Sequence, residues 1–382
     1  MKILADANIP YARECFSSIG DVTLLDGREM TSDTVTDCEI LLVRSITPVN
    51  AALLAGARVK FVATATIGFD HVDIDYLTRA NIGVASAPGS NANSAAEYVI
   101  AALLQIAQKY NIGLEGKSIG VVGVGNVGSR VAKKCQALGM HVLLNDPPLK
   151  RKTGDPNYLP LENLYDCDFL TLHTPLTVDG QDKTFHLAGE KLFKSLGKKC
   201  VFINASRGAV THSDAVSAAI NAGGLLGVVL DVWENEPNIE TELLKIVDIG
   251  TPHIAGHSLD GKIAGMISVY NAACEHFAIV PAHSIEDFLP KPEVPQLRLE
   301  PNPAKHVETL IAAVERVYDI RRDDVRLRGI QTTRSGQAGE FFHNLRKEYA
   351  VRREFHNTRI ALERPCEPLA RKLTGIGFKL ED

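Results

Sequence analysis

Three separate stretches each place side chains suited to acid–base or anion chemistry shortly after an apolar run. Arg207 occurs in CVFINASRG, Glu234 and Glu236 in GVVLDVWENEP, and His253 and His257 in VDIGTPHIAGH. A guanidinium can hold a carboxylate with two parallel hydrogen bonds. An imidazole can accept a hydroxyl proton, and a neighbouring carboxylate would stabilise the imidazolium. Such a set could support oxidation of a 2-hydroxy acid, which loses a hydride from carbon and a proton from oxygen.

A glycine-rich turn in IGVVGVGNVG predicts a dinucleotide site. Gly123, Gly125 and Gly128 form the GxGxxG pattern, between an apolar strand and the helical stretch SRVAKKCQALG. The first glycine permits the tight turn, the second lets the backbone approach a pyrophosphate, and the third allows close packing of helix on strand. The next strand, HVLLND, ends at Asp146, whose carboxylate would accept hydrogen bonds from ribose hydroxyls and repel a 2′-phosphate. We therefore expect NAD rather than NADP.

The elements that must position these groups are short apolar segments that alternate with helical ones. The apolar segments are KILAD, VTLLD, ILLVRS, FVATAT, GVASA, SIGVVGVG, HVLLND, FLTLHTP, CVFINAS, GVVLDVW and VDIGTPH. They are too short for helices and too continuously apolar for half-exposed strands. Buried parallel strands with helices on both faces fit best. Because the carboxyl ends of such strands share one edge, Arg207, Asp231, Glu236 and His253 can converge there.

Two such sets predict an α/β fold with two doubly wound, Rossmann-like parallel-sheet domains. We assign residues 1–92 and 257–280 to one domain and residues 93–256 to the other. The composition of the chain then changes at the proline-rich stretch VPAHSIEDFLPKPEVPQLRLEPNP. Residues 281–382 are therefore expected to form a third, smaller α+β unit, which includes the helical stretch AKHVETLIAAVERVYDIRRDD.

Composition excludes several classes of protein. The chain has 382 residues, 45% of them hydrophobic and 23% charged, with a formal net charge of -5. The absence of a basic excess argues against nucleic-acid partners, and the absence of a long apolar run argues against a membrane span. Seven cysteines are scattered without a CxxC pair, so we expect free thiols, a cytoplasmic location and no metal site.

The motifs GVGNVG, NASRG, DVWENEP and TPHIAG, in this order, resemble the D-2-hydroxyacid dehydrogenase family. The resemblance covers roughly the first 280 residues. It implies that Arg207, Glu236 and His253 are the catalytic residues. Glu236 is preferred over Glu234 because it directly precedes the proline, and His253 is preferred because it follows Thr-Pro.

The same resemblance implies further contacts to cofactor and substrate. The cofactor contacts, besides the three glycines and Asp146, are Asn126, Val127, Thr174, Ala205, Ser206, Arg207, Asp231 and Gly256, and the substrate contacts are Ser45, Thr66 and His257. Asp231 would hold the nicotinamide carboxamide. Thr174 could equally cap a helix, and Ser45 and Thr66 could cap strand ends. His257 stands where the resemblance predicts a tyrosine, and it can still donate a hydrogen bond.

The segments VERVYDIRRDDVRLR, AGEFFHNLRKEYAVRREF and GIGF resemble the extra C-terminal dimerisation domain of one branch of this family. That branch uses NAD to oxidise a phosphorylated four-carbon 2-hydroxy acid in pyridoxine biosynthesis. The resemblance therefore implies such a substrate and a homodimer formed through residues 281–382. The basic run at residues 346–355 is interrupted by Glu348 and Glu354, which predicts a solvated helix face or a dimer contact. A further hypothesis is that Arg346 reaches the substrate phosphate in the partner subunit.

Two alternatives remain open from the sequence. The chain could be another member of the same family, of the phosphoglycerate or glycerate type. It could also be an NAD-sensing binding protein built on the same fold without catalysis.

Overall fold

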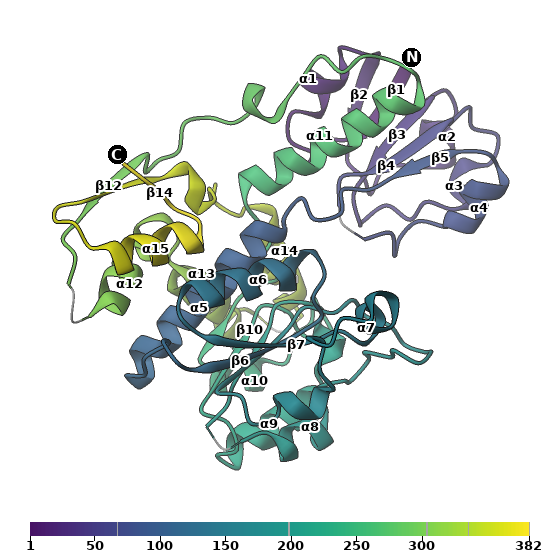
Figure 1. Ribbon diagram of the computed structural model, residues 1–382. Helices are drawn as coiled ribbons and strands as arrows, with labels where there is room; N and C mark the ends of the chain where they lie inside the picture. Colours follow the sequence, from purple (N-terminus) through teal and green to yellow (C-terminus); the bar gives the residue numbers. More distant parts are fainter. Residues whose placement is uncertain (67, 198, 303–304, 335, 382) are drawn as a thin grey trace. The chain divides into compact units, whose positions relative to one another are not determined.

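The computed structural model describes residues 1–66, 68–197, 199–302, 305–334 and 336–381 (Figure 1). The chain divides into two compact units. Unit 1 consists of Met1–Asn91 and Ser258–Lys291, and unit 2 consists of Ala92–His257 and Pro292–Asp382. Each unit is built on its own sheet of parallel strands with helices around it.

Unit 1 contains a parallel sheet with the strand order β2-β1-β3-β4-β5. Its strands are β1 (Lys2–Asp6), β2 (Asp21–Leu25), β3 (Ile40–Val43), β4 (Phe61–Thr64) and β5 (Gly83–Ala85), and its helices are α1 (Ala12–Phe16), α2 (Ser32–Val35), α3 (Ala51–Leu54), α4 (Ile74–Arg79) and α11 (Leu259–His276). Strands β3 and β4 are buried at every position, which explains their continuous apolar sequences. Helix α11 returns from later in the chain to cover one face, where Met266 and Tyr270 join the core.

Unit 2 contains a larger parallel sheet with the order β11-β10-β9-β8-β6-β7. Its strands are β6 (Ser118–Val122), β7 (His141–Asn145), β8 (Phe169–Leu172), β9 (Val201–Asn204), β10 (Gly227–Leu230) and β11 (Ile249–Gly250). The strand order reverses between β6 and β8, and open parallel sheets bind ligands at such a switch point. The predicted doubly wound parallel sheets are therefore confirmed in both units.

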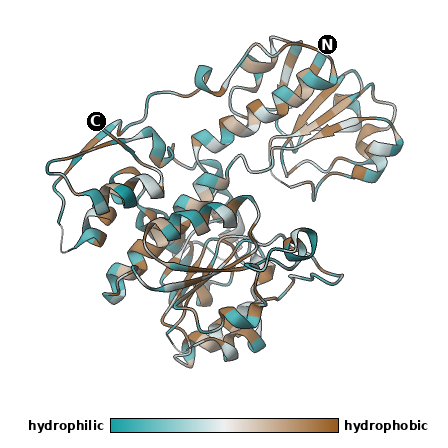
Figure 2. Cartoon of the chain, viewed as in Figure 1, coloured by the Kyte–Doolittle hydropathy of each residue, from teal (hydrophilic) through white to brown (hydrophobic). Residues whose placement is uncertain are grey.

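Helices cover both faces of the unit 2 sheet (Figure 1). They are α5 (Ala92–Tyr110), α6 (Asn126–Ala137), α7 (Pro147–Thr153), α8 (Glu190–Ser195), α9 (Ser213–Asn221) and α10 (Thr241–Ile246). Figure 2 shows the hydrophobic colour concentrated in the strands and the hydrophilic colour on loops and outer helix faces. Helix α5 is buried on nearly every side, because α6 and a C-terminal helix also pack on it.

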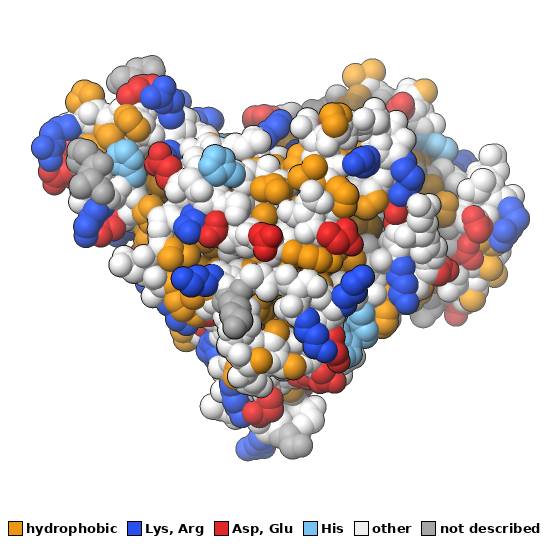
Figure 3. Space-filling view, turned by 60° about the horizontal axis from the view of Figure 1, so that its bottom comes forward, with side chains coloured by type: hydrophobic (Ala, Val, Ile, Leu, Met, Phe, Trp, Pro, Cys, Tyr) orange, Lys and Arg blue, Asp and Glu red, His pale blue; other side chains and the backbone are white. Residues whose placement is uncertain are grey.

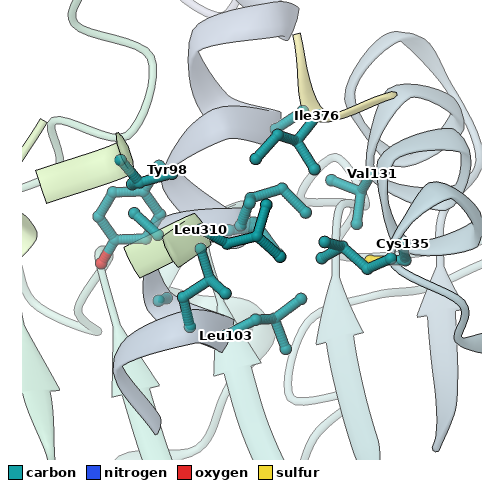
Figure 4. Packing of buried hydrophobic residues seen from close by; sticks show 14 of the residues in the cluster. Tyr98, Leu103, Val131, Cys135, Leu310 and Ile376 are labelled. Carbon is teal, nitrogen blue, oxygen red and sulfur yellow. The ribbon is translucent and has the colours of Figure 1, made fainter. Parts of the chain in front are cut away.

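The C-terminal segment adds a small parallel sheet with the order β12-β13-β14. Its elements are β12 (Gln296–Leu299), β13 (Arg359–Leu362), β14 (Lys379–Leu380), α12 (His306–Val317), α13 (Ile320–Arg328), α14 (Ala338–Lys347) and α15 (Glu367–Ile376). Leu310 of α12 and Ile376 of α15 join a buried cluster with Leu103 of α5 and Val131 of α6 (Figure 4). The C-terminal segment thus has the small sheet of its own that we expected after residue 281, and its helices share a core with the sheet of unit 2.

The basic run at residues 346–355 differs from its predicted solvated helix face. Helix α14 ends at Lys347, and Arg352, Arg353 and Glu354 are buried, with 5%, 7% and 6% of their surface exposed. Arg352 donates hydrogen bonds to the carbonyl oxygens of Ala255 (3.1 Å) and Ser94 (2.7 Å). The solvated-face interpretation is therefore wrong for residues 352–354, whereas Lys347 and Glu348 are exposed as it predicted.

In the described part of the chain, no helix is both long and apolar enough to span a bilayer. On the face shown in Figure 3, Lys and Arg side chains are interspersed with Asp and Glu side chains.

Candidate active site

Three neighbouring strands of unit 2 deliver the predicted catalytic side chains to one edge of the sheet. β9 ends three residues before Arg207, β10 ends directly before Asp231, and β11 ends three residues before His253. The loops are joined by backbone hydrogen bonds, from the Asp231 N–H to the Asn204 carbonyl (3.0 Å) and from the His253 N–H to the Asp231 carbonyl (2.7 Å). The loop positions thus follow from the parallel register of the strands.

Glu236 and His253 form a direct hydrogen bond. His253 Nδ1 lies 2.7 Å from Glu236 Oε2, and both side chains are only partly exposed, at 31% and 20%. The other carboxylate oxygen, Oε1, accepts a hydrogen bond of 2.7 Å from the Trp233 N–H. A carboxylate at Nδ1 favours the tautomer in which Nδ1 donates, which leaves Nε2 free to accept a proton.

The pKa of Glu236 lies below its usual range although the group is buried. Burial works to raise this pKa, but the charge of His253 and the hydrogen bonds from His253 and the Trp233 N–H outweigh it. Glu236 is therefore held as a carboxylate. Glu234, in contrast, makes no contact of this kind with His253. Its Oε1 lies 2.5 Å from His186 Nε2, and its Oε2 accepts a hydrogen bond from the Ser213 N–H.

Arg207 lies on a turn that the Asn204 side chain builds. The Asn204 amide donates to the Arg207 carbonyl (3.0 Å), and its Oδ1 accepts from the N–H and hydroxyl of Ser206 (3.0 and 2.8 Å). At Gly208 an added Cβ would lie 1.8 Å from the Trp233 carbonyl oxygen. The Arg207 turn is thus in backbone contact with the loop that carries Glu236, and only glycine fits there.

Asp231 is fully buried and fixes the loop of His253. Its Oδ1 accepts from the Thr251 hydroxyl (2.7 Å) and the Ile254 N–H (2.8 Å), and its Oδ2 accepts from the Ala255 N–H (2.9 Å). Tyr98 extends this chain through a hydrogen bond of 2.7 Å to Thr251. The observed contacts of Asp231 are therefore with this loop, and its contact with the nicotinamide carboxamide remains a prediction.

The glycine-rich turn has the geometry of a dinucleotide cradle. Gly123 has φ 84°, which favours glycine, and a Cβ on Gly128 would lie 1.9 Å from the Gly123 carbonyl oxygen. A Cβ on Gly125 would meet nothing within 4 Å, so open space lies over the turn. Helix α6 begins at Asn126, where Asn126 is exposed and Val127 half-buried. Its first N–H groups, which lack partners within a helix, are available to a pyrophosphate.

Asp146 lies directly after β7 and already accepts two backbone hydrogen bonds. One comes from the Val124 N–H (2.8 Å) and one from the Leu149 N–H at the start of α7 (2.9 Å). A carboxylate has further lone pairs, so ribose hydroxyls can still bind. Across the switch point, the hydroxyl oxygen of Thr174 is buried and has no hydrogen-bond partner among the described residues. Such an orphaned polar atom fits a bound cofactor better than a helix cap.

The remaining predicted cofactor residues lie on the same loops. Ala205 and Ser206 precede Arg207, with Ser206 buried, and half-buried Gly256 follows the backbone groups held by Asp231. His257 packs edge-on against the ring of Tyr349, with centroids 5.9 Å apart. This aromatic contact comes from the C-terminal segment.

Ser45 and Thr66 lie in unit 1, after the neighbouring strands β3 and β4. Ser45 is exposed. The Thr66 hydroxyl is 2.6 Å from that of Thr64. Both residues therefore lie at the carboxyl edge of the unit 1 sheet, and their contact with substrate remains a prediction.

Sequence reasoning missed several groups around this site. His173 is one of them, since burial lowers its pKa to about 3 and its Nε2 lies 3.0 Å from the Thr171 hydroxyl. Tyr98, in the middle of a helix, gave no local signal of its link to Thr251. Arg352 looked like one charge in a basic run. Only the position of His173 directly after a buried strand could have marked it as close to the glycine-rich turn, where an added Cβ on Gly123 would lie 2.8 Å from the His173 carbonyl.

Comparisons with known proteins show the family and the fold of this chain. The model "D-isomer specific 2-hydroxyacid dehydrogenase, NAD binding domain" matches residues 95–255, and a domain of unknown function (DUF3410) matches residues 288–377. The structure of the TT0316 protein from Thermus thermophilus aligns with a TM-score of 0.65 at 25% identity, covering 74% of this chain and 99% of that one. An NAD+-bound 3-phosphoglycerate dehydrogenase from Entamoeba histolytica aligns with a TM-score of 0.60 at 24% identity, covering 76% and 99%.

Curated relatives match along almost the entire chain. The erythronate-4-phosphate dehydrogenase of Proteus mirabilis is 45% identical, over 99% of each chain. That of Chromohalobacter salexigens is 43% identical, over 100% of this chain and 99% of its own. The chain therefore belongs to the D-isomer specific 2-hydroxyacid dehydrogenase family and is an NAD-dependent dehydrogenase. Within that family it falls in the erythronate-4-phosphate dehydrogenase branch.

Proposed function

We propose that this chain uses NAD to oxidise 4-phospho-D-erythronate to (R)-3-hydroxy-2-oxo-4-phosphobutanoate, as a step of pyridoxine biosynthesis. Full-length relatives that carry the name of this activity support the proposal. The observation that carries it is the 2.7 Å hydrogen bond between His253 and Glu236, on loops that contact the turn of Arg207.

Each of the three residues has one task in the proposed mechanism. The Arg207 guanidinium holds the substrate carboxylate with paired hydrogen bonds and so fixes the adjacent carbinol carbon. Neutral His253 accepts the hydroxyl proton at Nε2. Glu236, through its hydrogen bond to Nδ1, orients the ring and stabilises the imidazolium that forms.

The cofactor residues divide between two ends of NAD. The N–H groups at the start of α6 would hold the pyrophosphate, and Asp146 would hold the adenosine ribose. The unpartnered Thr174 hydroxyl fits the space beside the turn. When bound, NAD supplies the nicotinamide ring that accepts the hydride from the carbinol carbon.

A substrate panel tests the proposed function. NADH formation is measured with 4-phospho-D-erythronate, 3-phosphoglycerate and D-glycerate, and the first is expected to give the highest kcat/KM. His253→Asn is the informative variant, because His253 has φ 57° and asparagine tolerates this left-handed conformation. It should reduce kcat by about 100- to 10,000-fold while NAD still binds.

His141→Asn, at an exposed position at the start of β7, is the matched control and should retain activity. Preference for 3-phosphoglycerate would assign the chain to another member of the family. NAD binding without turnover of any acid would indicate a binding protein instead.

We also propose that the chain forms a homodimer through its C-terminal segment and acts in the cytoplasm. Val325 of α13 and Val351 are candidates for the dimer contact, since they expose 68% and 70% of their surface. Light scattering should give the mass of a dimer, and Val325→Glu with Val351→Glu should shift it towards the monomer. An unchanged mass would place the contact elsewhere.

A further inference from the structure

Helix α14 lies directly against the residues that follow Glu236. A Cβ on Gly339 would lie 2.6 Å from Asn238 Oδ1 and 3.4 Å from Pro237 Cγ. Phe342 of α14 is buried in the same cluster as Trp233. The C-terminal segment therefore packs on the catalytic loop of its own chain.

Arg346 lies on the face of α14 that meets this loop. Arg346 follows Gly339 by seven residues, which is about two helical turns, so both positions lie on the same face of α14. The rise of the helix places it about 10 Å further along the axis. Its guanidinium lies near enough to Glu236 for its charge to help lower the pKa of that carboxyl. Arg346 is thus a cation beside the pair formed by Glu236 and His253.

One nitrogen of the Arg346 guanidinium lacks the partner that its burial calls for. Its Nε is buried without a hydrogen-bond partner, and its side chain joins no ion pair within the part of the chain that the structure describes. Glu236 does not serve as that partner, since its hydrogen bonds are made with Trp233 and His253. A partly buried, unpaired guanidinium next to a reaction site is best satisfied by an anion that arrives with the substrate.

We propose that Arg346 binds the phosphate of the substrate in the active site of its own chain. The inference rests on the proposed function, in which Arg207 takes the carboxylate of the same molecule. A substrate with anions at both ends then requires a second cation, and a guanidinium matches the geometry of phosphate oxygens. Arg346 would thereby select a phosphorylated acid over the same acid without phosphate.

Two substrates that differ only in the phosphate test this assignment. For Arg346→Ala, kcat/KM for 4-phospho-D-erythronate should fall by about 100-fold, mainly through KM. The kcat/KM for D-erythronate should fall far less, and Arg346→Lys should restore part of the loss with the phosphorylated acid. Lys347→Ala removes a neighbouring exposed charge of the same sign and should leave both values unchanged. Equal losses for both acids, or none, would overturn the proposal.

Binding of inorganic phosphate gives a readout that does not depend on turnover. Calorimetry on the NAD-loaded protein should detect phosphate binding to the wild type and to Lys347→Ala, and a loss of binding in Arg346→Ala. Equal affinities in all three proteins would contradict the site. If the wild type does not oxidise 4-phospho-D-erythronate at all, the proposed function fails, whereas this measurement still tests Arg346.

Mixed oligomers test whether the arginine acts in its own chain. Chains with His253→Asn are mixed with chains with Arg346→Ala, unfolded and refolded together. If both groups serve one chain, activity on the phosphorylated acid should not exceed the mean of the two parents. Recovery above that mean would assign Arg346 to the site of the partner subunit.

Discussion

His253 and Glu236 meet at 2.7 Å from loops that are each fixed by the backbone. The His253 N–H donates to the Asp231 carbonyl, and Glu236 accepts from the Trp233 N–H. The Glu236 side chain cannot turn away without losing the hydrogen bond from the Trp233 N–H, and the His253 ring cannot turn away without losing its hydrogen bond to Glu236. The pair is therefore held in place before substrate binds, as catalysis by a positioned base requires.

Replacing Glu236 with glutamine should separate its catalytic role from general packing. Glu236→Gln retains the size of the side chain but removes the charge that stabilises the imidazolium, so kcat should fall by about 100-fold or more. Glu234→Gln is the matched control, since Glu234 bonds His186 instead. Steady-state kinetics with similar losses for both variants would contradict the assignment.

Glu236→Gln should also change how the stability of the protein depends on pH in the acid range. The pKa of Glu236 is lowered in the folded chain, so the unfolded state binds more protons in the window just below the ordinary value. The contribution of Glu236 to folding stability is present at pH values above its pKa in the unfolded state. That contribution is lost as the pH falls through the pKa of Glu236 in the folded state. Melting temperatures should therefore decline less steeply with acidification in Glu236→Gln than in the wild type.

Two glycines of the turn should respond differently to the same added methyl group. In Gly128→Ala the new carbon would lie 1.9 Å from the Gly123 carbonyl oxygen, so α6 must move and the melting temperature should drop. Gly125→Ala meets only open space and should fold normally. It should nevertheless bind NAD more weakly, because the methyl group occupies the approach of the pyrophosphate. Normal NAD affinity in Gly125→Ala would argue against this position of the cofactor.

Buried Glu97 of α5 should make the protein less stable as pH rises. Burial raises its pKa to about 8, with Glu354 adding to the effect and Lys134 opposing it. Between the ordinary value and about pH 8, the unfolded state releases this proton while the folded state retains it. The contribution of Glu97 to stability is therefore largest below its pKa in the unfolded state, and it is lost as the pH rises through its pKa in the folded state.

Glu97→Gln should flatten this dependence, because glutamine does not titrate. Scanning calorimetry across that pH window should show a falling melting temperature for the wild type and a smaller decline for the variant. Glu242→Gln, whose side chain is 81% exposed on α10, should follow the wild type. Parallel curves for all three proteins would mean that the proton on Glu97 does not control stability here.

Local patterns were sufficient to predict the parts of the molecule that depend on neighbouring residues. The positive φ of Gly123 and the start of α6 follow from the GxGxxG pattern. The helical stretch at residues 304–324 is broken into α12 and α13, where the Asp319 side chain caps the second helix. That cap was present in the sequence and could have been recognised.

Contacts between distant segments could not be predicted in this way. Nothing near Arg352 in sequence shows that the carbonyls of Ala255 and Ser94 receive it. The shared core of α5 and α12 likewise depends on how amphipathic faces combine, which periodicity alone does not decide. The change in composition near residue 281 correctly indicated a distinct segment. Composition alone, however, does not show which helices and strands that segment packs against.

The burial of α5 and α6 beneath α12 and α15 has a practical consequence for any shortened form of this protein. A chain cut before Pro292 would leave Leu103 and Val131 facing water on a surface that normally never meets it. Such a fragment should aggregate rather than survive as a minimal dehydrogenase. The tail is thus a structural requirement of the catalytic half, and only the whole polypeptide is a sound starting point for engineering.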